Sequence, residues 1–230
     1  NHKGINDAGS TLDEKIISDA SKFFETGQKT QLHYSVKNTD RTIGAKLSSA
    51  LYNKFSDTEI NDDQLTLNLE GSAGQSLGAF AVKGISLKVE GDANDYVGKS
   101  LSGAKIVIRP HKNSHLITNE NTIIGNTCMY GATSGYLYAS GQAGERFAVR
   151  NSGATAVVEG IGSNGCEYMT GGNIVILGHT GDNFGAGMTG GMAFVYDIDG
   201  KFKYRINEET LIFDNIKSNY WENILQEFVV

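Results

Sequence analysis

The stretch "GATAVVEGIGSNGCEYMTGGNIVILG", residues 153–178, has a short apolar run at each end and five glycines between the runs. Glycine weakens a strand by about 0.5–1 kcal/mol relative to alanine, so this fold must need the backbone freedom that glycine gives. A glycine precedes similar apolar runs elsewhere, and the set is Gly84, Gly103, Gly135, Gly153, Gly172 and Gly191. The intervals are 19, 32, 18, 19 and 19 residues, which indicates a repeat with one insertion around "HKNSHLITNENT".

An earlier copy extends the repeat, because "LTLNLEG" (65–71) matches "ISLKVEG" (85–91) and raises the number of copies to seven. One strand with its turns cannot bury its own apolar face, whereas stacked copies can, with parallel strands about 4.8 Å apart. The reference glycines are expected at corners, with positive φ, where a side chain would collide with the next coil. The sequence therefore predicts a single-stranded parallel β-helix of about seven coils over residues 64–198.

Two columns follow from aligning the copies on the reference glycine. Four positions after it we expect one uniformly apolar stack, formed by Val107, Ala139, Val157, Ile176 and Val195. Two positions before it we expect a hydrogen-bonded polar ladder, formed by Thr133, Asn151, Thr170 and Thr189. The left-handed helix of hexapeptide acyltransferases needs an aliphatic residue every six positions. The series from Phe147 and from Ile106 both fail that requirement.

The two flanks differ from the repeat in composition. Residues 1–63 are predicted to be an N-terminal lead-in and cap, with helices over 10–27 and 41–55 and a strand over 31–38. Residues 199–230 are predicted to be a tail that ends in an amphipathic helix over 218–228. We expect these elements to cover the open ends of the β-helix, where strand edges would otherwise be unpaired.

Composition limits the function classes. The net charge of −6 argues against nucleic acid or an anionic membrane as a partner. No apolar run approaches the roughly 20 residues that span a membrane, and no signal peptide is recognised. Two cysteines in 230 residues are typical of a reducing compartment. A cytoplasmic protein is the expectation.

Few side chains have a pattern that suggests chemistry. His111 and His115 have the spacing of a helical metal pair, but they lie in a polar insertion without a third ligand, so a solvated loop is favoured. His179 is expected at a corner. The acids Glu70, Glu90 and Glu159 end their strands, and Arg109 and Asp197 are predicted in the same column. This mixture favours a charged corner over a catalytic acid pair.

The remaining candidates are weaker. "GSAGQSLG" (71–78) lacks the lysine of a phosphate loop, and Ser72, Ser76 and Ser152 have no nucleophile setting. Cys128 and Cys166 are predicted two coils apart, about 9.6 Å along the stack, which exceeds the roughly 7 Å limit for a disulfide. We expect two buried thiols. The sequence thus predicts no catalytic, cofactor-binding or metal-binding residue in this chain.

Long motifs identify a family. They are "NTDRTIGAKLS" (38–48), "GSAGQSLGAF" (71–80), "VEGDANDYVGKSLSG" (89–103), "NTIIGNTCMYGATSG" (121–135), "AGERFAVRNSGATAVVEG" (143–160), "GCEYMTGG" (165–172) and "AGMTGG" (186–191). Together they closely resemble the C-terminal glycine-motif (GXGXG) domain of the glutamate synthase large (alpha) subunit. The resemblance implies a right-handed parallel β-helix.

It also implies a parent oxidoreductase of glutamate biosynthesis and nitrogen assimilation. That enzyme converts glutamine and 2-oxoglutarate into two glutamates, with NAD(P)H or ferredoxin as reductant, and carries FMN and an iron–sulfur cluster. In the family this domain is a scaffold beside the glutaminase and FMN-binding domains, so the isolated chain is expected to be inactive and to hold no cofactor. A small reductase subunit is a further expected partner, and the location is the cytoplasm or a plastid stroma.

Three alternatives remain beside this interpretation. The same glycine-repeat domain occurs as a β-helix subunit of formylmethanofuran dehydrogenase, and the chain could equally be a separately encoded part of glutamate synthase. A free-standing carbohydrate-active β-helix would need clustered acidic and basic side chains on a strand face, which these strands lack.

Continuous apolar runs lead to the last expectation. Runs such as 106–108, 174–177 and 194–196 are apolar on both strand faces, which indicates cover on both sides. The flanking helices are expected to be too few to supply it, so one lateral face is predicted to be an exposed apolar interface.

Overall fold

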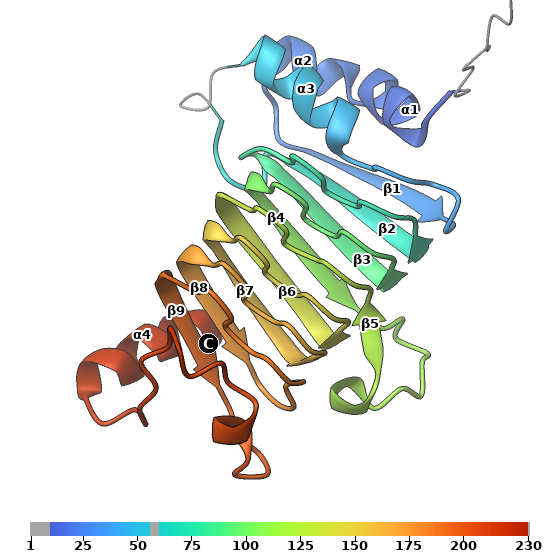
Figure 1. The fold of residues 1–230 in the computed structure, drawn as a ribbon. Helices are drawn as coiled ribbons and strands as arrows, with labels where there is room; N and C mark the ends of the chain where they lie inside the picture. The colour runs from blue at the N-terminus through green and yellow to red at the C-terminus, as the bar shows by residue number, and fades with distance from the viewer. Residues whose placement is uncertain (1–9, 56–59, 230) are drawn as a thin grey trace, which may run out of the picture.

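The computed structural model describes residues 10–55 and 60–229, which form a β-solenoid of about seven turns (Figure 1). One parallel sheet has the order β1-β2-β3-β4-β6-β7-β8-β9, and the short β5 pairs with β3 and β6. The strands are β1 (Thr30–Val36), β2 (Leu65–Ala73), β3 (Ile85–Ala93), β4 (Ser102–Arg109), β5 (Thr122–Ile124), β6 (Ser134–Ala143), β7 (Ser152–Ile161), β8 (Thr170–Ile176) and β9 (Gly190–Val195). The predicted solenoid is confirmed.

The first two predicted copies stack as their sequences suggest. Strands β2 and β3 pair without a register shift from Leu65–Ile85 to Ala73–Ala93. Strand β1 adds to β2 in parallel, with Thr30 opposite Leu65. The sheet therefore begins inside the segment that the sequence suggested as a lead-in.

Three helices lie at the N-terminal end of the solenoid, beyond β1 (Figure 1). They are α1 (Leu12–Asp19), α2 (Ser21–Thr26) and α3 (Ala45–Lys54). The predicted first helix is divided at Ala20, whose φ of −84° and ψ of 9° interrupt it, and it ends at Gly27 as expected, with φ of 68°. Ile16 and Leu47 are fully buried in this end of the core.

A buried carboxylate joins two of these helices. Asp13 Oδ1 accepts the Gly44 N–H at 2.8 Å, and Oδ2 accepts the Leu47 N–H at 3.1 Å. The free N–H groups at the start of α3 are thus satisfied by a side chain from α1. Burial raises the pKa of Asp13 above its ordinary value, although these hydrogen bonds oppose the shift.

The inner face of the sheet forms the core. One column runs through Leu87, Ile106, Leu137, Ala156 and Ile174, and each of these side chains is fully buried. The next inward column consists of Leu69, Val89, Ile108, Ala139, Val158, Ile176 and Val195.

The predicted apolar column was wrong, because it combined two faces of the sheet. Ala139, Ile176 and Val195 do lie in the inward column, but Val107 and Val157 pair with Tyr138 on the outer face. The cause is a register shift near the start of the strands, for example between Ser102 and Lys105. A shift of one residue moves a side chain to the opposite face, so counting from the glycine fails beyond the shift.

The reference glycines have the following geometry. Positive φ values are 94° at Gly84, 115° at Gly103, 99° at Gly135, 86° at Gly172 and 86° at Gly191. Gly153 does not have positive φ, but a Cβ there would lie 2.2 Å from the Thr133 carbonyl oxygen. Close approach between coils therefore requires glycine at this position.

The polar column forms side chain–backbone bonds at two positions. Asn151 is fully buried, and its Nδ2 donates to the carbonyls of Ala154 at 2.9 Å and Gly171 at 3.2 Å. Thr133 Oγ1 donates to the Leu101 carbonyl at 3.2 Å.

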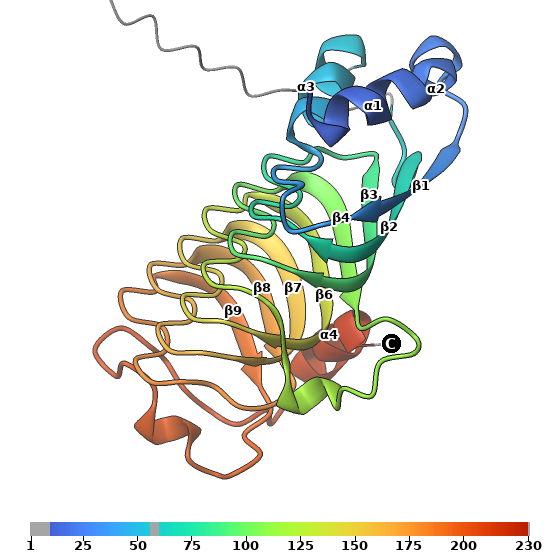
Figure 2. The same ribbon diagram turned by 90° about the vertical axis from the view of Figure 1, so that its right-hand side faces the viewer.

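A second wall of the solenoid carries a repeat that the sequence did not suggest. In six coils three alternate residues have φ between 51° and 72°, at 76/78/80, 96/98/100, 127/129/131, 146/148/150, 164/166/168 and 183/185/187. The Tyr96 N–H donates to the Asn126 carbonyl of the next coil at 2.9 Å, whereas the Gly98 N–H donates back to Leu77 at 2.9 Å. This two-way ladder connects the stacked loops in Figure 2.

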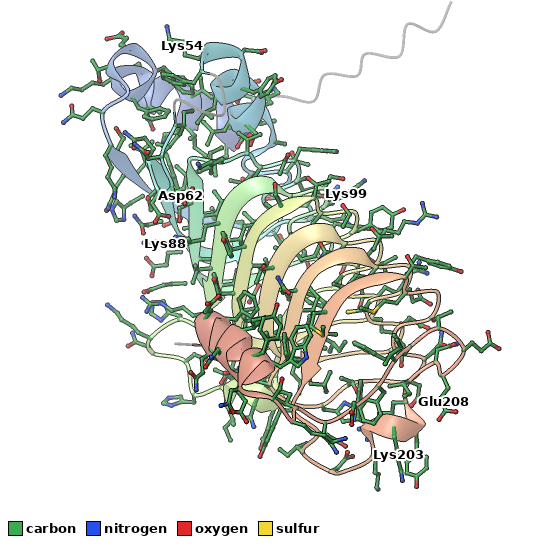
Figure 3. All side chains as sticks on the ribbon, turned by 90° about the vertical axis from the view of Figure 1, so that its left-hand side faces the viewer. Lys54, Asp62, Lys88, Lys99, Lys203 and Glu208 are labelled. Atoms are coloured by element: carbon green, nitrogen blue, oxygen red, sulfur yellow. The ribbon has the colours of Figure 1, made fainter. Side chains whose placement is uncertain are left out.

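The sequence predicts that the C-terminal helix α4 (Asn219–Val229) caps an end of the solenoid, and this prediction is wrong. The helix lies across the outer face of the last strands (Figure 3). Trp221, Ile224, Leu225 and Phe228 pack on a cluster formed by Val157, Val175 and Phe194. The predicted exposed apolar face is therefore wrong for these three residues, which are 8%, 1% and 7% exposed. No helix within the described ranges is long and apolar enough to cross a membrane.

Candidate functional site

The outer face of β1–β4, beside the area that α4 covers, is an open polar groove of about 780 Å³. Lys88, labelled in Figure 3, extends from β3 on this side of the sheet. The charged and polar side chains that line the groove include His33, Asp63, Asn68, Glu70, Lys88, Glu90, Lys105 and Arg109. Two of the four carboxylates of the predicted charged corner, Glu70 and Glu90, lie here.

Acids in the groove are paired with bases. Lys105 Nζ donates to Asp63 Oδ2 at 2.9 Å, and this hydrogen bond lowers the pKa of Asp63 and raises that of Lys105. The guanidinium of Arg109 donates to Glu90. Pairs of this kind, exposed to solvent, contribute about 0–1 kcal/mol each, so they are weak as sources of stability.

Strand register accounts for the predicted mixture of charges. Glu70 lies opposite Glu90, and Glu90 lies opposite Arg109, so the predicted mixed-charge column is confirmed at these three residues. Asp197 does not belong to it, contrary to expectation. Ile176 pairs with Val195, so the residue opposite Leu177 is Tyr196, and Asp197 lies one position further along the chain.

The histidines lie apart from one another. His111 Nε2 is 3.1 Å from Glu70 Oε1, which ties the start of the insertion to β2. His115 is exposed in the same insertion, and His179 is an exposed corner residue whose carbonyl accepts the Ile161 N–H. Within residues 10–55 and 60–229, no three His, Cys, Asp or Glu side chains are grouped as metal ligands would be.

The two cysteines are buried free thiols, as predicted. The coil containing Phe147 and Ala148 separates them. The Ala148 N–H donates to the backbone carbonyl of Cys128, and the Cys166 N–H donates to the backbone carbonyl of Phe147. Burial raises the pKa of each thiol to about 12. Neither is a reactive thiolate at neutral pH.

The serines occupy structural positions. Ser72 and Ser152 lie in β2 and β7, and Ser152 Oγ donates to the Ala132 carbonyl. Ser76 begins the first set of the positive-φ ladder. Among the described hydrogen bonds, none joins these hydroxyls to a histidine.

Two features were missed by reasoning from the sequence. The Lys105–Asp63 pair joins β4 to the loop before β2, and the Asp13 cap joins α1 to α3. Both connect residues that lie far apart in the chain, so local spacing carries no signal for them. The positive-φ ladder has residues as different as Phe80, Tyr96 and Arg150 at its positions, so residue type carries no consistent signal for it either.

Comparison with known proteins gives a consistent picture. The family model described as "GXGXG motif" matches residues 13–230. The chain is 59% identical to the glutamate synthase [NADPH] large chain of Azospirillum brasilense over 227 residues, which are 99% of this chain and 15% of that protein. It is 53% identical to glutamate synthase [NADH] of Schizosaccharomyces pombe over 198 residues, 86% of this chain and 9% of that one. It is 47% identical to ferredoxin-dependent glutamate synthase 2 of Synechocystis over 234 residues, 100% of this chain and 15% of that one. The chain thus spans a small part of the relatives that it matches.

Proposed function

The chain belongs to the GXGXG motif family, and from this membership we propose that it is the β-solenoid region of a glutamate synthase large chain and acts there as a scaffold. The parent activity would form two glutamates from glutamine and 2-oxoglutarate with a nicotinamide or ferredoxin reductant. The observation that carries the proposal is the 59% identity across 99% of the chain. The solenoid would brace the glutaminase and FMN-binding domains of that large chain.

The residues of this chain support a role outside the chemistry. The candidate acids of the groove form ion pairs with Lys105 and Arg109 and a hydrogen bond with His111, as they would in a structural surface. An activated nucleophile needs an adjacent base, and Ser72, Ser76 and Ser152 have none among their described hydrogen bonds.

The iron–sulfur cluster of the parent does not fit this chain. Such clusters are held by four thiolates in their common forms, and the chain has two cysteines. Both are buried and protonated, on different coils. We therefore assign the cluster to another part of the parent enzyme. We propose the same for FMN and for the nicotinamide or ferredoxin site, because the glycine-rich stretch 71–78 lacks the lysine of a phosphate loop.

The test uses the full large chain with its two half-reactions measured separately. These are hydrolysis of glutamine and ammonia-dependent formation of glutamate. Glu70→Gln and Glu90→Gln remove the two groove acids that the sequence pattern offered as a candidate acid pair. For a scaffold we expect both rates to stay within about twofold of the wild type, because loss of a general acid or base costs about 10²–10⁴-fold.

A variant that weakens the contact between two coils tests whether the solenoid couples the two half-reactions. Gly172→Ala strains the contact between two coils, so it should lower the ratio of glutamate formed to glutamine hydrolysed while each half-reaction persists. A large loss of one half-reaction in Glu70→Gln or Glu90→Gln, with the fold intact, would overturn the scaffold assignment.

A further inference from the structure

The two ends of the solenoid differ. At the N-terminal end, helices α1–α3 lie over the core beyond β1 (Figure 1). At the other end β9 is the last strand of the sheet, and α4 lies on its outer face rather than over its edge (Figure 3). An edge strand presents unpaired N–H and C=O groups, and proteins normally cover or block them.

The hydrogen-bond pattern identifies the unpaired groups of β9. The Tyr196 N–H donates to the Ile176 carbonyl at 2.8 Å, so this peptide faces β8. Successive peptides of a strand face alternate neighbours, so Phe194 also faces β8, whereas Ala193 and Val195 face away. In the described part of the chain, no loop residue bonds to the backbone of Ala193 or Val195.

The side chains of the same two residues belong to the core. Ala193 follows Ile174 in the inward column, and Val195 follows Ile176. Ile174 and Ile176 are fully buried, but Ala193 and Val195 are partly exposed because no strand follows them. Tyr196, 64% exposed, extends the apolar surface beyond the strand. The edge therefore has both the backbone groups and the apolar side chains to accept another strand.

We propose that an extended segment of the parent large chain, from outside the solenoid, pairs in parallel with β9 and completes the core. This rests on the proposed function. The chain covers 15% of the Azospirillum relative, so most of such a polypeptide is available to supply the segment. The partner segment would carry an apolar side chain at every second position, to cover Ala193 and Val195, because alternate residues of a strand share a face.

Hydrogen exchange of single backbone amides tests the pairing. The amides of Ala193 and Val195 are compared between the 230-residue chain and the full large chain, with the Phe194 amide as an internal control already bonded to β8. We expect exchange at Ala193 and Val195 to slow by a factor on the order of 100 in the full chain, and Phe194 to change little. Equal exchange in the two proteins would overturn the proposal.

A variant pair separates docking at the edge from general effects. Val195→Lys places a charge on the inward side of the edge, whereas Tyr196→Lys places the same charge next to it on an exposed side chain. In the full chain we expect fast exchange at Ala193 to return with Val195→Lys only. If Val195→Lys does not fold, the comparison of the two wild-type proteins still decides.

A second copy of this chain is the competing occupant. In that case protection of Ala193 and Val195 would rise with concentration in the isolated chain, with a dimer mass by light scattering, and the proposal would be wrong. Exchange reports the pairing independently of catalysis, whereas the half-reaction rates of Glu70→Gln test the scaffold role. Failure of one idea is therefore distinguishable from failure of the other.

Discussion

At the scale of single residues, backbone conformation and close contact between coils decide which side chains are allowed. Gly172 combines a φ of 86° with a Cβ position 2.3 Å from the Ala154 carbonyl oxygen. Gly27 has a φ of 68° but nothing within 4 Å of its Cβ position. The two glycines therefore separate the energy of positive φ from the energy of steric overlap.

We expect Gly27→Ala to cost about 1–2 kcal/mol in the free energy of unfolding, from the left-handed backbone alone. Gly172→Ala should cost about 1–3 kcal/mol more, because the neighbouring coil must move away from the new methyl group. Urea denaturation of both variants measures the difference. Equal losses would show that the coils yield without cost.

The buried thiols predict a dependence of stability on alkaline pH. The pKa of Cys128 and of Cys166 is raised from 9.0 to about 12 in the folded chain, so the unfolded chain loses these protons first. The stabilising effect is complete below pH 9 and is lost as the pH rises toward 12. The slope reaches about 1.4 kcal/mol per pH unit for each thiol.

Cys166→Ala should halve this thiol contribution, and alanine already occupies the equivalent ladder position at Ala148. Denaturation at about pH 8 and above about pH 9, for wild type and variant, measures the change in slope. Neither thiol should react with a thiol reagent near neutral pH until the chain is unfolded. Fast labelling of the folded protein, or an unchanged slope in the variant, would contradict the burial argument.

At the scale of elements, α4 is a lateral cover for the sheet. Its apolar side packs on Val157, Val175 and Phe194, and the ring centroids of Trp221 and Phe194 are 6.3 Å apart. Continuous apolar runs in β7–β9 are thus explained within the chain. The outer face of β1–β4, where Asn68 and Lys88 replace apolar residues, has no such cover within the described ranges and forms the polar groove.

Leu225→Asp should release α4, because it places a carboxylate in the contact with the sheet. Gln226→Asp adds the same charge to the exposed side of the helix and serves as the control. Trp221 is the single tryptophan, so its fluorescence reports the contact directly. We expect a red-shifted emission and a loss of about 2–3 kcal/mol for Leu225→Asp only. A matching response from both variants would show that the helix is not held by this face.

At the scale of the whole molecule, helices α1–α3 cover one end of the solenoid and α4 covers one side. At the other end Phe202, Ile206 and Leu211 pack against the core and Ile206 bridges to Phe184, so the edge of β9 is the part left without a neighbour in the described residues. Each coil contacts its neighbours through both the sheet and the positive-φ ladder, so the structure is continuous from β1 to β9. Stability in such stacks comes from nearest-neighbour contacts, and the strand β9 of the last coil lacks one such neighbour in the sheet. The edge of β9 is consequently where a further segment would contribute most to the stack.

The repeat, the class of fold and the family could all be predicted from the amino-acid sequence alone. They follow from short-range facts, namely the period of the glycines, the apolar runs between them and long family motifs. The separation of Cys128 from Cys166 and the mixed charges of Glu70, Glu90 and Arg109 were predictable too, because these depend only on counting coils.

Which face each side chain occupies, and what covers that face, depended on contacts in three dimensions. A register shift of one residue moved Val107 and Val157 to the outer face. Such shifts are set by the pairing between strands, and a local sequence pattern contains no information about that pairing. The amphipathic pattern of α4 showed that the helix has a partner surface. Which surface it covers depended on where the chain returns after β9, and that is set by contacts between residues far apart in the sequence.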